Sequence, residues 1–266
     1  MCVLALAWKA HPRWHLVMAG NRDELHARPA APLANWGAPL PLIAGRDLQS
    51  GGTWLGVSEQ GRFAVVTNLR GHGMPRADRS SRGALVTDLL AAAGEYADPD
   101  RALLSDFNPF NLILADQHRA MFLSNRPESV RSLLAPGLYG LSNGTLDEPW
   151  PKTLRLKQIL LDWIVQDATE PAGLLDGLGE DALPAAGLNP ATPSDVPQEP
   201  QLSPIFIRNP VYGTRCSTVV AIDNRGQGQI IERRYTSTGD VSGETAIAFS
   251  WPPPTLNKAF KSLAEG

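Results

Sequence analysis

Short apolar runs typical of β-strands fill both ends of the chain, and only two long helical segments interrupt them. This distribution is the strongest constraint on the fold, because two helices cannot cover both faces of a large sheet unless two sheets also pack on each other. The sequence therefore predicts a layered α+β sandwich in which both ends of the chain pair within one core. Strands are expected at Val3–Trp8, Leu16–Ala19, Thr53–Ser58, Arg62–Leu69, Asn111–Ala115, Ala120–Ser124, Leu138–Ser142, Thr214–Ile222, Gly228–Tyr235 and Thr245–Ser250.

The helical segments carry apolar residues at helical spacing together with the usual signals at their ends. Ala84–Ala93 follows a pair of serines that can cap a helix, and Trp150–Val165 has Pro151 in its first turn, where proline is tolerated. A short helix is expected at Leu256–Ala264. Leu183–Pro204 carries six prolines, so a long loop is expected there.

The bulk composition excludes several classes of protein. With 266 residues, of which 43% are hydrophobic, the chain can bury a full core, and one domain over residues 1–266 is expected. The net charge is −3 without a lysine and arginine cluster, so nucleic acid is not an expected partner. Two cysteines make no disulfide framework, and the chain has neither a signal-peptide pattern nor an apolar span of ~20 residues. A cytoplasmic protein without an integral membrane segment is expected, and its oligomeric state is left open.

Cys2 directly follows the initiator methionine at the head of an apolar strand-like run. If Met1 is removed, Cys2 carries a thiol and a free α-amine on one carbon, and the amine, with a pKa near ~8, can act as the base for the thiol. Free cysteine is also often a small core residue, and Cys2 considered alone favours that interpretation.

A polar group, Asn21-Arg22-Asp23-Glu24, follows the strand that is expected to pair with the strand at Cys2. In such a hairpin Arg22 favours a thiolate and Asp23 can orient the α-amine. The alternative is a solvated turn with a local ion pair. Arg215 opens a core-like strand and needs a carboxylate partner, which is either a substrate or a structural partner such as Asp23 or Glu24.

Two asparagines stand at strand ends, Asn68 after Val65-Val66-Thr67 and Asn143 before Gly144. An asparagine amide at such a place can donate to a developing oxyanion, and the loss of one donor costs about 3–4 kcal/mol of barrier. Turn formation is the alternative, and Asn143 considered alone favours it because Asn-Gly is a common turn dipeptide.

Other motifs carry weaker signals. The glycine turn at 51–56 lacks the spacing of a phosphate loop, and its Trp54 lines an apolar pocket or simply packs. The five histidines form no metal-ligand pattern, so no metal site is expected; His72, in a glycine-flanked loop, is the candidate ligand for haem iron. Cys216 is expected to be a core residue.

These pieces together resemble the NRDE family, also called the transport and Golgi organisation protein 2 family. The motifs that carry the resemblance run in order over most of the chain. They are Met1-Cys2, Asn21-Arg22-Asp23-Glu24, Arg28-Pro29, Gly45-Arg46-Asp47, Gly51-Gly52-Thr53-Trp54-Leu55-Gly56, Thr67-Asn68, Leu141-Ser142-Asn143-Gly144 and Thr214-Arg215-Cys216-Ser217-Thr218-Val219.

That family in turn looks like the N-terminal nucleophile hydrolases, and the resemblance implies their four-layer αββα sandwich. It also implies the chemistry of the cholylglycine hydrolase, penicillin V acylase and acyl-CoA:6-aminopenicillanic acid acyltransferase group, in which an N-terminal cysteine attacks an amide or thioester carbonyl. The roles that the resemblance implies are nucleophile and base for Cys2, α-amine holder for Asp23, oxyanion donors for Asn68 and Asn143, and electrostatic support for Arg215.

A second function stays open, because members of the family have been linked to haem trafficking and to lipid or acyl-CoA metabolism. A non-catalytic carrier of haem or an acyl lipid would use the same pocket. Arg22, Trp54 and His72 are the candidates for substrate or ligand binding. Neither function requires a cofactor. The expected partner is a small acyl substrate, or haem as a bound ligand.

Overall fold

The fold is known from a computed structural model, which describes residues 2–73, 75–182 and 203–252. Of the expected proline-rich loop Leu183–Pro204, residues 183–202 lie outside the described residues. The helix expected at Leu256–Ala264 also lies outside them.

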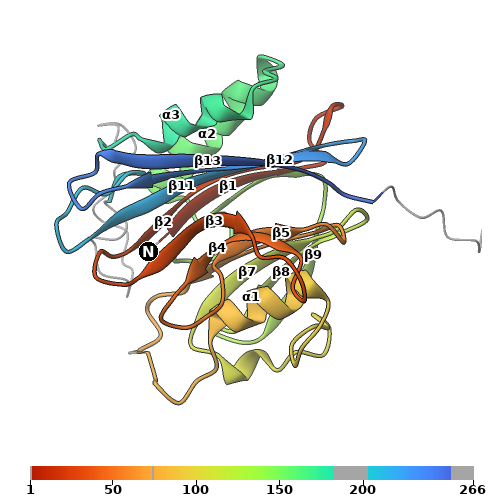
Figure 1. The fold of residues 1–266 in the computed structure, drawn as a ribbon, viewed down its shortest axis with the longest axis vertical. Helices are drawn as coiled ribbons and strands as arrows, with labels where there is room; N and C mark the ends of the chain where they lie inside the picture. The colour runs from red at the N-terminus through yellow and green to blue at the C-terminus, as the bar shows by residue number, and fades with distance from the viewer. Residues whose placement is uncertain (1, 74, 183–202, 253–266) are drawn as a thin grey trace, which may run out of the picture.

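The described residues form four stacked layers (Figure 1). The helices α2 (Pro151–Val165) and α3 (Leu174–Leu178) lie on the outer face of a six-stranded sheet, and a seven-stranded sheet packs against its inner face. The helix α1 (Arg82–Ala91) covers the outer face of the seven-stranded sheet. The layered α+β sandwich expected from the order of strands and helices is therefore confirmed, and so is the αββα layer order that the resemblance implied.

The six-stranded sheet joins the first and last thirds of the chain, as expected. Its order is β10-β1-β2-β11-β12-β13, and every neighbouring pair is antiparallel. The hairpin of β1 and β2 is confirmed, and β2 also pairs with β11 from the last third. The bounds are β1 (Cys2–Trp8), β2 (Trp14–Leu25), β10 (Gly137–Leu141), β11 (Tyr212–Asp223), β12 (Gln227–Tyr235) and β13 (Val241–Ser250).

The seven-stranded sheet follows chain order and is also antiparallel throughout. Its four central strands from β5 to β8 were expected, and β3, β4 and β9 were not. The strand β3 contains Pro32, which is tolerated because β3 lies at the sheet edge. The bounds are β3 (Ala30–Asn35), β4 (Leu42–Asp47), β5 (Leu55–Ser58), β6 (Arg62–Asn68), β7 (Phe110–Ala115), β8 (Ala120–Ser124) and β9 (Val130–Leu134).

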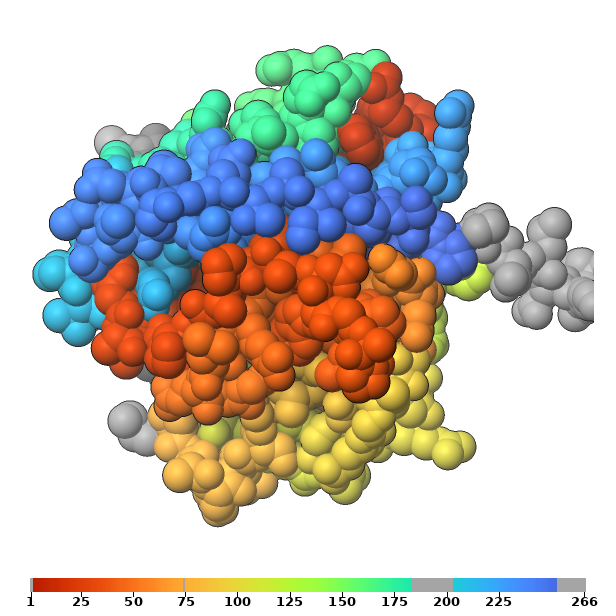
Figure 2. All heavy atoms as spheres, viewed as in Figure 1, coloured from red at the N-terminus to blue at the C-terminus, as the bar shows by residue number. Residues whose placement is uncertain are grey.

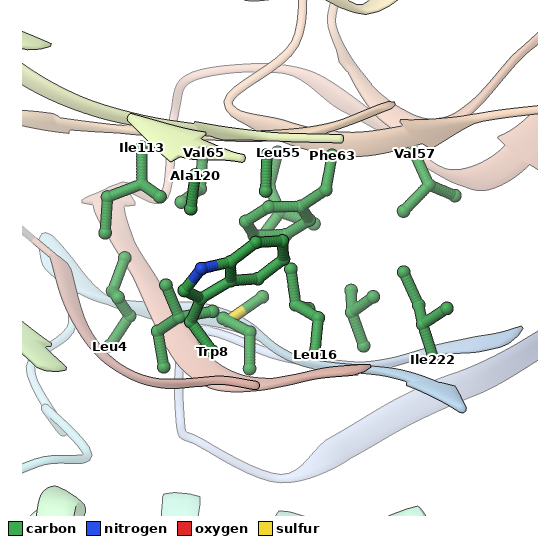
Figure 3. Packing of buried hydrophobic residues seen from close by; sticks show 14 of the residues in the cluster. Leu4, Trp8, Leu16, Leu55, Val57, Phe63, Val65, Ile113, Ala120 and Ile222 are labelled. Atoms are coloured by element: carbon green, nitrogen blue, oxygen red, sulfur yellow. The ribbon is translucent and has the colours of Figure 1, made fainter. Parts of the chain in front are cut away.

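Alternating side chains of the strands supply the cores between the layers. Leu4 and Trp8 of β1 point toward Phe63 and Ile113 of the seven-stranded sheet (Figure 3). The alternate β1 residues Val3, Ala5 and Ala7 pack under α2 instead. Strands buried on both faces read as nearly continuous apolar runs, which is the pattern seen in the sequence. Figure 2 shows the blue atoms of β12 and β13 lying directly against the red and orange atoms of the seven-stranded layer.

The helices end and pack as their sequence signals indicate. Ser81 caps α1, accepting a hydrogen bond at its side chain from the backbone N–H of Ala84, and Leu85 and Leu89 face the sheet. Pro151 stands in the first turn of α2. Within the described parts of the chain, no helix is long and apolar enough to span a membrane.

The polar group Asn21–Glu24 lies inside β2 and not in a turn after it, which corrects the expected boundary. Pairing on both sides is the physical reason, because β2 is flanked by β1 and β11 as far as these residues. The register places Arg22 opposite Cys2 on one side and opposite Cys216 on the other. The polar group is thus built into the sheet beside the start of the chain.

Candidate active site

Cys2 is half-buried at the head of β1, with its side chain on the face that looks toward the seven-stranded sheet. A small pocket of about 20 Å³ beside it is lined mainly by apolar residues, including Leu4, Val66 and Trp54. Cys216 is 3% exposed, and burial raises the pKa of its thiol well above the ordinary value. The expectation that Cys216 is a core residue is therefore confirmed.

A polar cleft of about 520 Å³ opens at the same place. The six-stranded sheet contributes Cys2 and Asp23 to its lining, the seven-stranded sheet contributes Asn68, and the start of α1 contributes Arg82. Trp54 lines both the cleft and the small pocket. Of the two interpretations of Trp54, a pocket residue or a packing residue, the first therefore describes it. The cleft is thus the place where a substrate can reach the thiol.

Arg22 is 7% exposed and links the two sheets. Its Nη2 lies 3.5 Å from Oδ2 of Asp47 in β4, and its guanidinium lies 4.2 Å from the centre of the Trp54 ring. Asp47 also accepts from Nε of Arg28 at 2.6 Å and from the backbone N–H of Ser50. Burial acts to raise the pKa of the Asp47 carboxyl, but these hydrogen bonds and the two arginines hold it below the usual value. The alternative interpretation, a solvated turn with a local ion pair, is wrong, because Arg22 lies inside β2 and pairs with Asp47 of the other sheet in a buried contact.

Asp23 is 2% exposed; strand alternation places it on the face of β2 opposite to Arg22, and it also lines the cleft. Its Oδ1 accepts a hydrogen bond of 2.7 Å from Oγ1 of Thr214. Burial raises the pKa of the Asp23 carboxyl, while Lys152, Thr214 and Arg22 act in the opposite direction. A buried carboxylate therefore lies at the position where the hairpin register brings β2 beside the first residues.

Asn68 and Asn143 lie next to each other in the structure but differ in exposure. Asn68 is exposed and lines the cleft, whereas Asn143 is fully buried and does not line it. Nδ2 of Asn143 donates to the Asn68 carbonyl at 2.7 Å, and Oγ of the neighbouring Ser142 donates to the Cys2 carbonyl at 2.7 Å. The segment 142–143 thus ties the end of β6 to the head of β1.

Arg215 lies apart from the cleft. Its Nη1 donates to the carbonyls of Leu25, His26 and Arg28, at 2.8, 3.2 and 3.0 Å. The expected carboxylate partner is absent from the described residues, because backbone oxygens satisfy the guanidinium instead. Arg215 therefore fixes the chain that leaves β2 and leads to Arg28.

His72 is exposed and does not line the cleft. Haem needs an axial ligand and a slot between apolar walls, but the lining around Cys2 is polar and the apolar pocket there measures about 20 Å³. His72 and this cleft therefore do not fit haem together. No group of three or more metal-ligating side chains occurs within the described residues.

The sequence interpretation missed two charged residues of the site. Lys152 is fully buried in the first turn of α2, and helical spacing from Leu156 and Leu160 is the signal that could have found it. Arg82 opens α1 into the cleft, where burial lowers the pKa of its guanidinium while Cys2 and Glu24 act to raise it. No sequence pattern distinguishes Arg82 from an ordinary arginine in a first turn.

The layers and the cleft define an α+β sandwich protein with a reachable cysteine thiol between its two sheets. The sequence model of the Transport and Golgi organisation 2 family matches residues 1–237. The Bos taurus homologue of Transport and Golgi organization protein 2 is 32% identical over 270 residues, covering 92% of this chain and 97% of its own. The Homo sapiens homologue is 32% identical over 258 residues, covering 88% of this chain and 92% of its own. The chain belongs to the Transport and Golgi organisation 2 family, as the resemblance implied.

A solved structure also aligns with most of the chain. It is a mutant of the conjugated bile acid hydrolase from Clostridium perfringens, with a TM-score of 0.49 and 10% sequence identity. The alignment covers 93% of this chain and 92% of that one.

Proposed function

We propose that this protein is a cysteine N-terminal nucleophile hydrolase or acyltransferase that acts on an amide or thioester bond once Met1 has been removed. One observation carries the proposal: the half-buried Cys2 at the head of β1 lines the polar cleft together with the buried Asp23. A cysteine that only filled the core would not line a cleft of about 520 Å³.

The reaction begins at the thiol. The neutral α-amine of Cys2 accepts the thiol proton, and the sulfur forms a bond to the carbonyl carbon while an electron pair moves to the carbonyl oxygen. Asn68, which lines the cleft, donates to this oxyanion. The tetrahedral intermediate then expels the leaving amine or thiol, which takes the proton from the α-ammonium, and an acyl thioester remains on Cys2.

The second half of the reaction releases the acyl group. Water, or another nucleophile in a transferase, attacks the thioester carbonyl, and its proton passes through the α-amine to the departing sulfur. Asp23 holds the α-amine in position. Asn143 acts by holding the backbone of Asn68, and Arg215 acts by fixing the chain that leads to Arg28.

The lining of the cleft also bears on the substrate. Five arginines line it, Arg22, Arg28, Arg76, Arg79 and Arg82, against the three carboxylates Asp23, Glu24 and Asp47, and Arg82 forms no ion pair among the described residues. Its one hydrogen bond, from Nη1 to the Pro109 carbonyl, leaves most of its donors for a ligand. An acyl substrate with a negatively charged group is therefore the expected class.

Two measurements test the proposal. Intact-mass analysis of the purified protein identifies the first residue, and removal of Met1 is the expected result. An electrophilic acyl probe should then label the wild-type protein, and Cys2→Ala should abolish the label, whereas the matched control Cys216→Ala should keep it because Cys216 is buried. A protein that retains Met1 throughout, or a Cys2→Ala variant that is still labelled, contradicts the proposal.

Carriage of haem or an acyl lipid without catalysis, the alternative that the resemblance left open, gains no support from the cleft, because the cleft lining is polar and the apolar pocket beside Cys2 measures about 20 Å³. A saturable hemin titration in a protein that no acyl probe labels would favour it. His72→Ala should leave that titration unchanged, because His72 is exposed and outside the cleft.

A further inference from the structure

Thr214 lies near the start of β11, directly opposite Asp23 of β2 in the strand register. It is 1% exposed, so its hydroxyl group needs hydrogen-bond partners within the protein. Its Oγ1 donates to Oδ1 of Asp23 at 2.7 Å and accepts from the backbone N–H of Ile207 at 2.9 Å. The backbone N–H of Thr214 in turn donates to the Ile207 carbonyl at 3.0 Å. Thr214 therefore joins Asp23 to the chain that leads into β11.

The hydroxyl group of Thr214 has one proton, and its two contacts indicate where that proton lies. The N–H of Ile207 can only donate, so it takes a lone pair of Oγ1 and leaves the hydroxyl proton for Asp23. The distance of 2.7 Å to Asp23 is that of a hydrogen bond from a hydroxyl group to an ionised carboxylate. Because such a bond is stronger to the ionised carboxylate than to the neutral acid, it favours an ionised Asp23.

The segment around Ile207 also shows why Asp23 needs such a donor. Ile205 and Phe206 are buried, and Nδ2 of Asn21 donates to the Ile205 carbonyl at 2.9 Å. Strand alternation places Asn21 and Asp23 on the same face of β2, so this segment covers the face that carries the carboxylate. A carboxylate that is shielded from water remains ionised only where the protein supplies hydrogen bonds or positive charge.

Two charged groups among the described residues also act on the Asp23 carboxyl. Burial raises its pKa, whereas Lys152, the hydrogen bond from Thr214 and Arg22 act in the opposite direction. The hydrogen bond adds what a charge alone does not supply, because it fixes one carboxylate oxygen at a definite place. The contact with Thr214 therefore bears on the orientation of Asp23 as well as on its ionisation.

We propose that Thr214 is a positioning residue that holds Asp23 ionised and in a fixed orientation for the α-amine of Cys2. The inference deepens the proposed function and rests on it, because Asp23 holds the α-amine there. Asp23 lines the cleft, whereas Thr214 does not line it, so Thr214 acts through the carboxylate and touches no substrate.

Titration of the Asp23 side-chain carboxyl carbon by NMR spectroscopy tests this role without any turnover. Asp23→Asn identifies the signal, because that signal is missing from its spectrum. Thr214→Val keeps the shape of the side chain and removes the donor, so it should move the midpoint of the Asp23 titration upward by about one to two pH units. Thr214→Ser keeps the hydroxyl group and should restore the wild-type midpoint.

Thr87→Val is the matched control for this titration. Thr87 is also buried, but its Oγ1 donates to a neutral partner, the Gly83 carbonyl, at 2.9 Å within α1. Its replacement should leave the Asp23 midpoint in place. A wild-type midpoint in Thr214→Val, or an equal shift in Thr87→Val, overturns the inference.

A second pair of variants covers the case in which Thr214→Val does not fold. Thr214→Ala and Thr214→Ser differ from each other only in the hydroxyl group, and neither adds volume to the core. A higher Asp23 midpoint in the alanine variant than in the serine variant supports the inference. Equal midpoints in the two variants overturn it.

Acyl labelling of Cys2 separates the inference from the proposed function. Thr214→Val should slow the labelling at neutral pH roughly tenfold, because the α-amine is no longer held in place, and Thr214→Ser should restore the rate. A shifted Asp23 midpoint in a protein that no acyl probe labels rejects the proposed chemistry and keeps the effect of Thr214 on Asp23. Labelling of Cys2 with equal Asp23 midpoints keeps the chemistry and overturns the inference.

Discussion

Charged side chains at the cleft end of the sandwich are buried and linked to one another. Arg22 and Arg28, on the two sides of the turn that leaves β2, share Asp47 from the other sheet. A buried guanidinium that lost this carboxylate would leave its donors and its charge without compensation. The pair thus makes the geometry around Cys2 depend on contact between the two sheets.

Asp47→Asn should reduce the free energy of unfolding by about 1–3 kcal/mol at neutral pH. Because the pKa of Asp47 is lowered in the folded protein, its stabilisation is present above the unfolded pKa and is lost as the pH falls through the folded pKa. The difference between variant and wild type should therefore shrink as the pH falls, which urea denaturation at a series of pH values measures.

Asp78→Asn is the matched control for this prediction. Asp78 pairs with Arg76 at the same 2.6 Å distance that separates Arg28 from Asp47, but on the exposed surface. The Asp78→Asn substitution should leave the free energy of unfolding unchanged within error. Equal losses in the two variants would contradict the argument that burial makes the Asp47 pair important.

The position of α1 depends on two glycines. A Cβ added at Gly52 would meet the backbone of Gly83, and the backbone N–H of Thr53 donates to the Gly83 carbonyl at 3.4 Å. The helix start can therefore approach the glycine turn only without side chains there. This approach places Arg82 in the lining of the cleft.

Gly52→Ala should displace the start of α1, lower the free energy of unfolding by about 1–3 kcal/mol and reduce acyl labelling of Cys2. Gly137→Ala is the control, since a Cβ there meets nothing nearer than 3.7 Å. Thermal unfolding and the labelling rate are the two measurements. A Gly52→Ala variant that matches Gly137→Ala in both would show that α1 tolerates a wider gap.

At the scale of the whole molecule, the apolar layer between the sheets holds the cleft in shape. Leu16 of β2 is 0% exposed within this layer and points toward the seven-stranded sheet (Figure 3). Every strand that supplies a cleft residue also supplies side chains to this core or to the one beneath α1. Stability and site geometry therefore share the same packing.

Leu16→Ala should cost about 2–5 kcal/mol of unfolding free energy, because it leaves a cavity between two sheets that cannot collapse independently. Leu133→Ala is the matched control, since Leu133 is 67% exposed on the edge strand β9, and its loss should stay within about 0.5 kcal/mol. Urea unfolding curves of the two variants check the difference. Similar urea midpoints in the two variants would contradict the argument that the apolar layer between the sheets stabilises the fold.

Local patterns along the chain were sufficient for much of the fold. The apolar runs predict the hairpin of β1 and β2, the central strands β5 to β8 and the helices α1 and α2, because strand alternation, caps and turn residues act within a few positions. The strands β3, β4 and β9 escaped prediction. The strands β3 and β9 lie at the sheet edges and most of their residues are not buried, so neither forms an apolar run. The strand β4 ends in Gly45-Arg46-Asp47, which interrupts its apolar run.

The sequence by itself determined which residues could carry chemistry, including Cys2, Asp23 and Asn68, because residue type and the order of strands are local properties. Only the tertiary structure decided what surrounds them. The burial of Lys152, the link from Arg22 to Asp47 and the contact of Asn143 with the Asn68 backbone all join segments from different layers. Such contacts arise when sheets and helices pack on one another, and no pattern within a single segment encodes the partner on another layer.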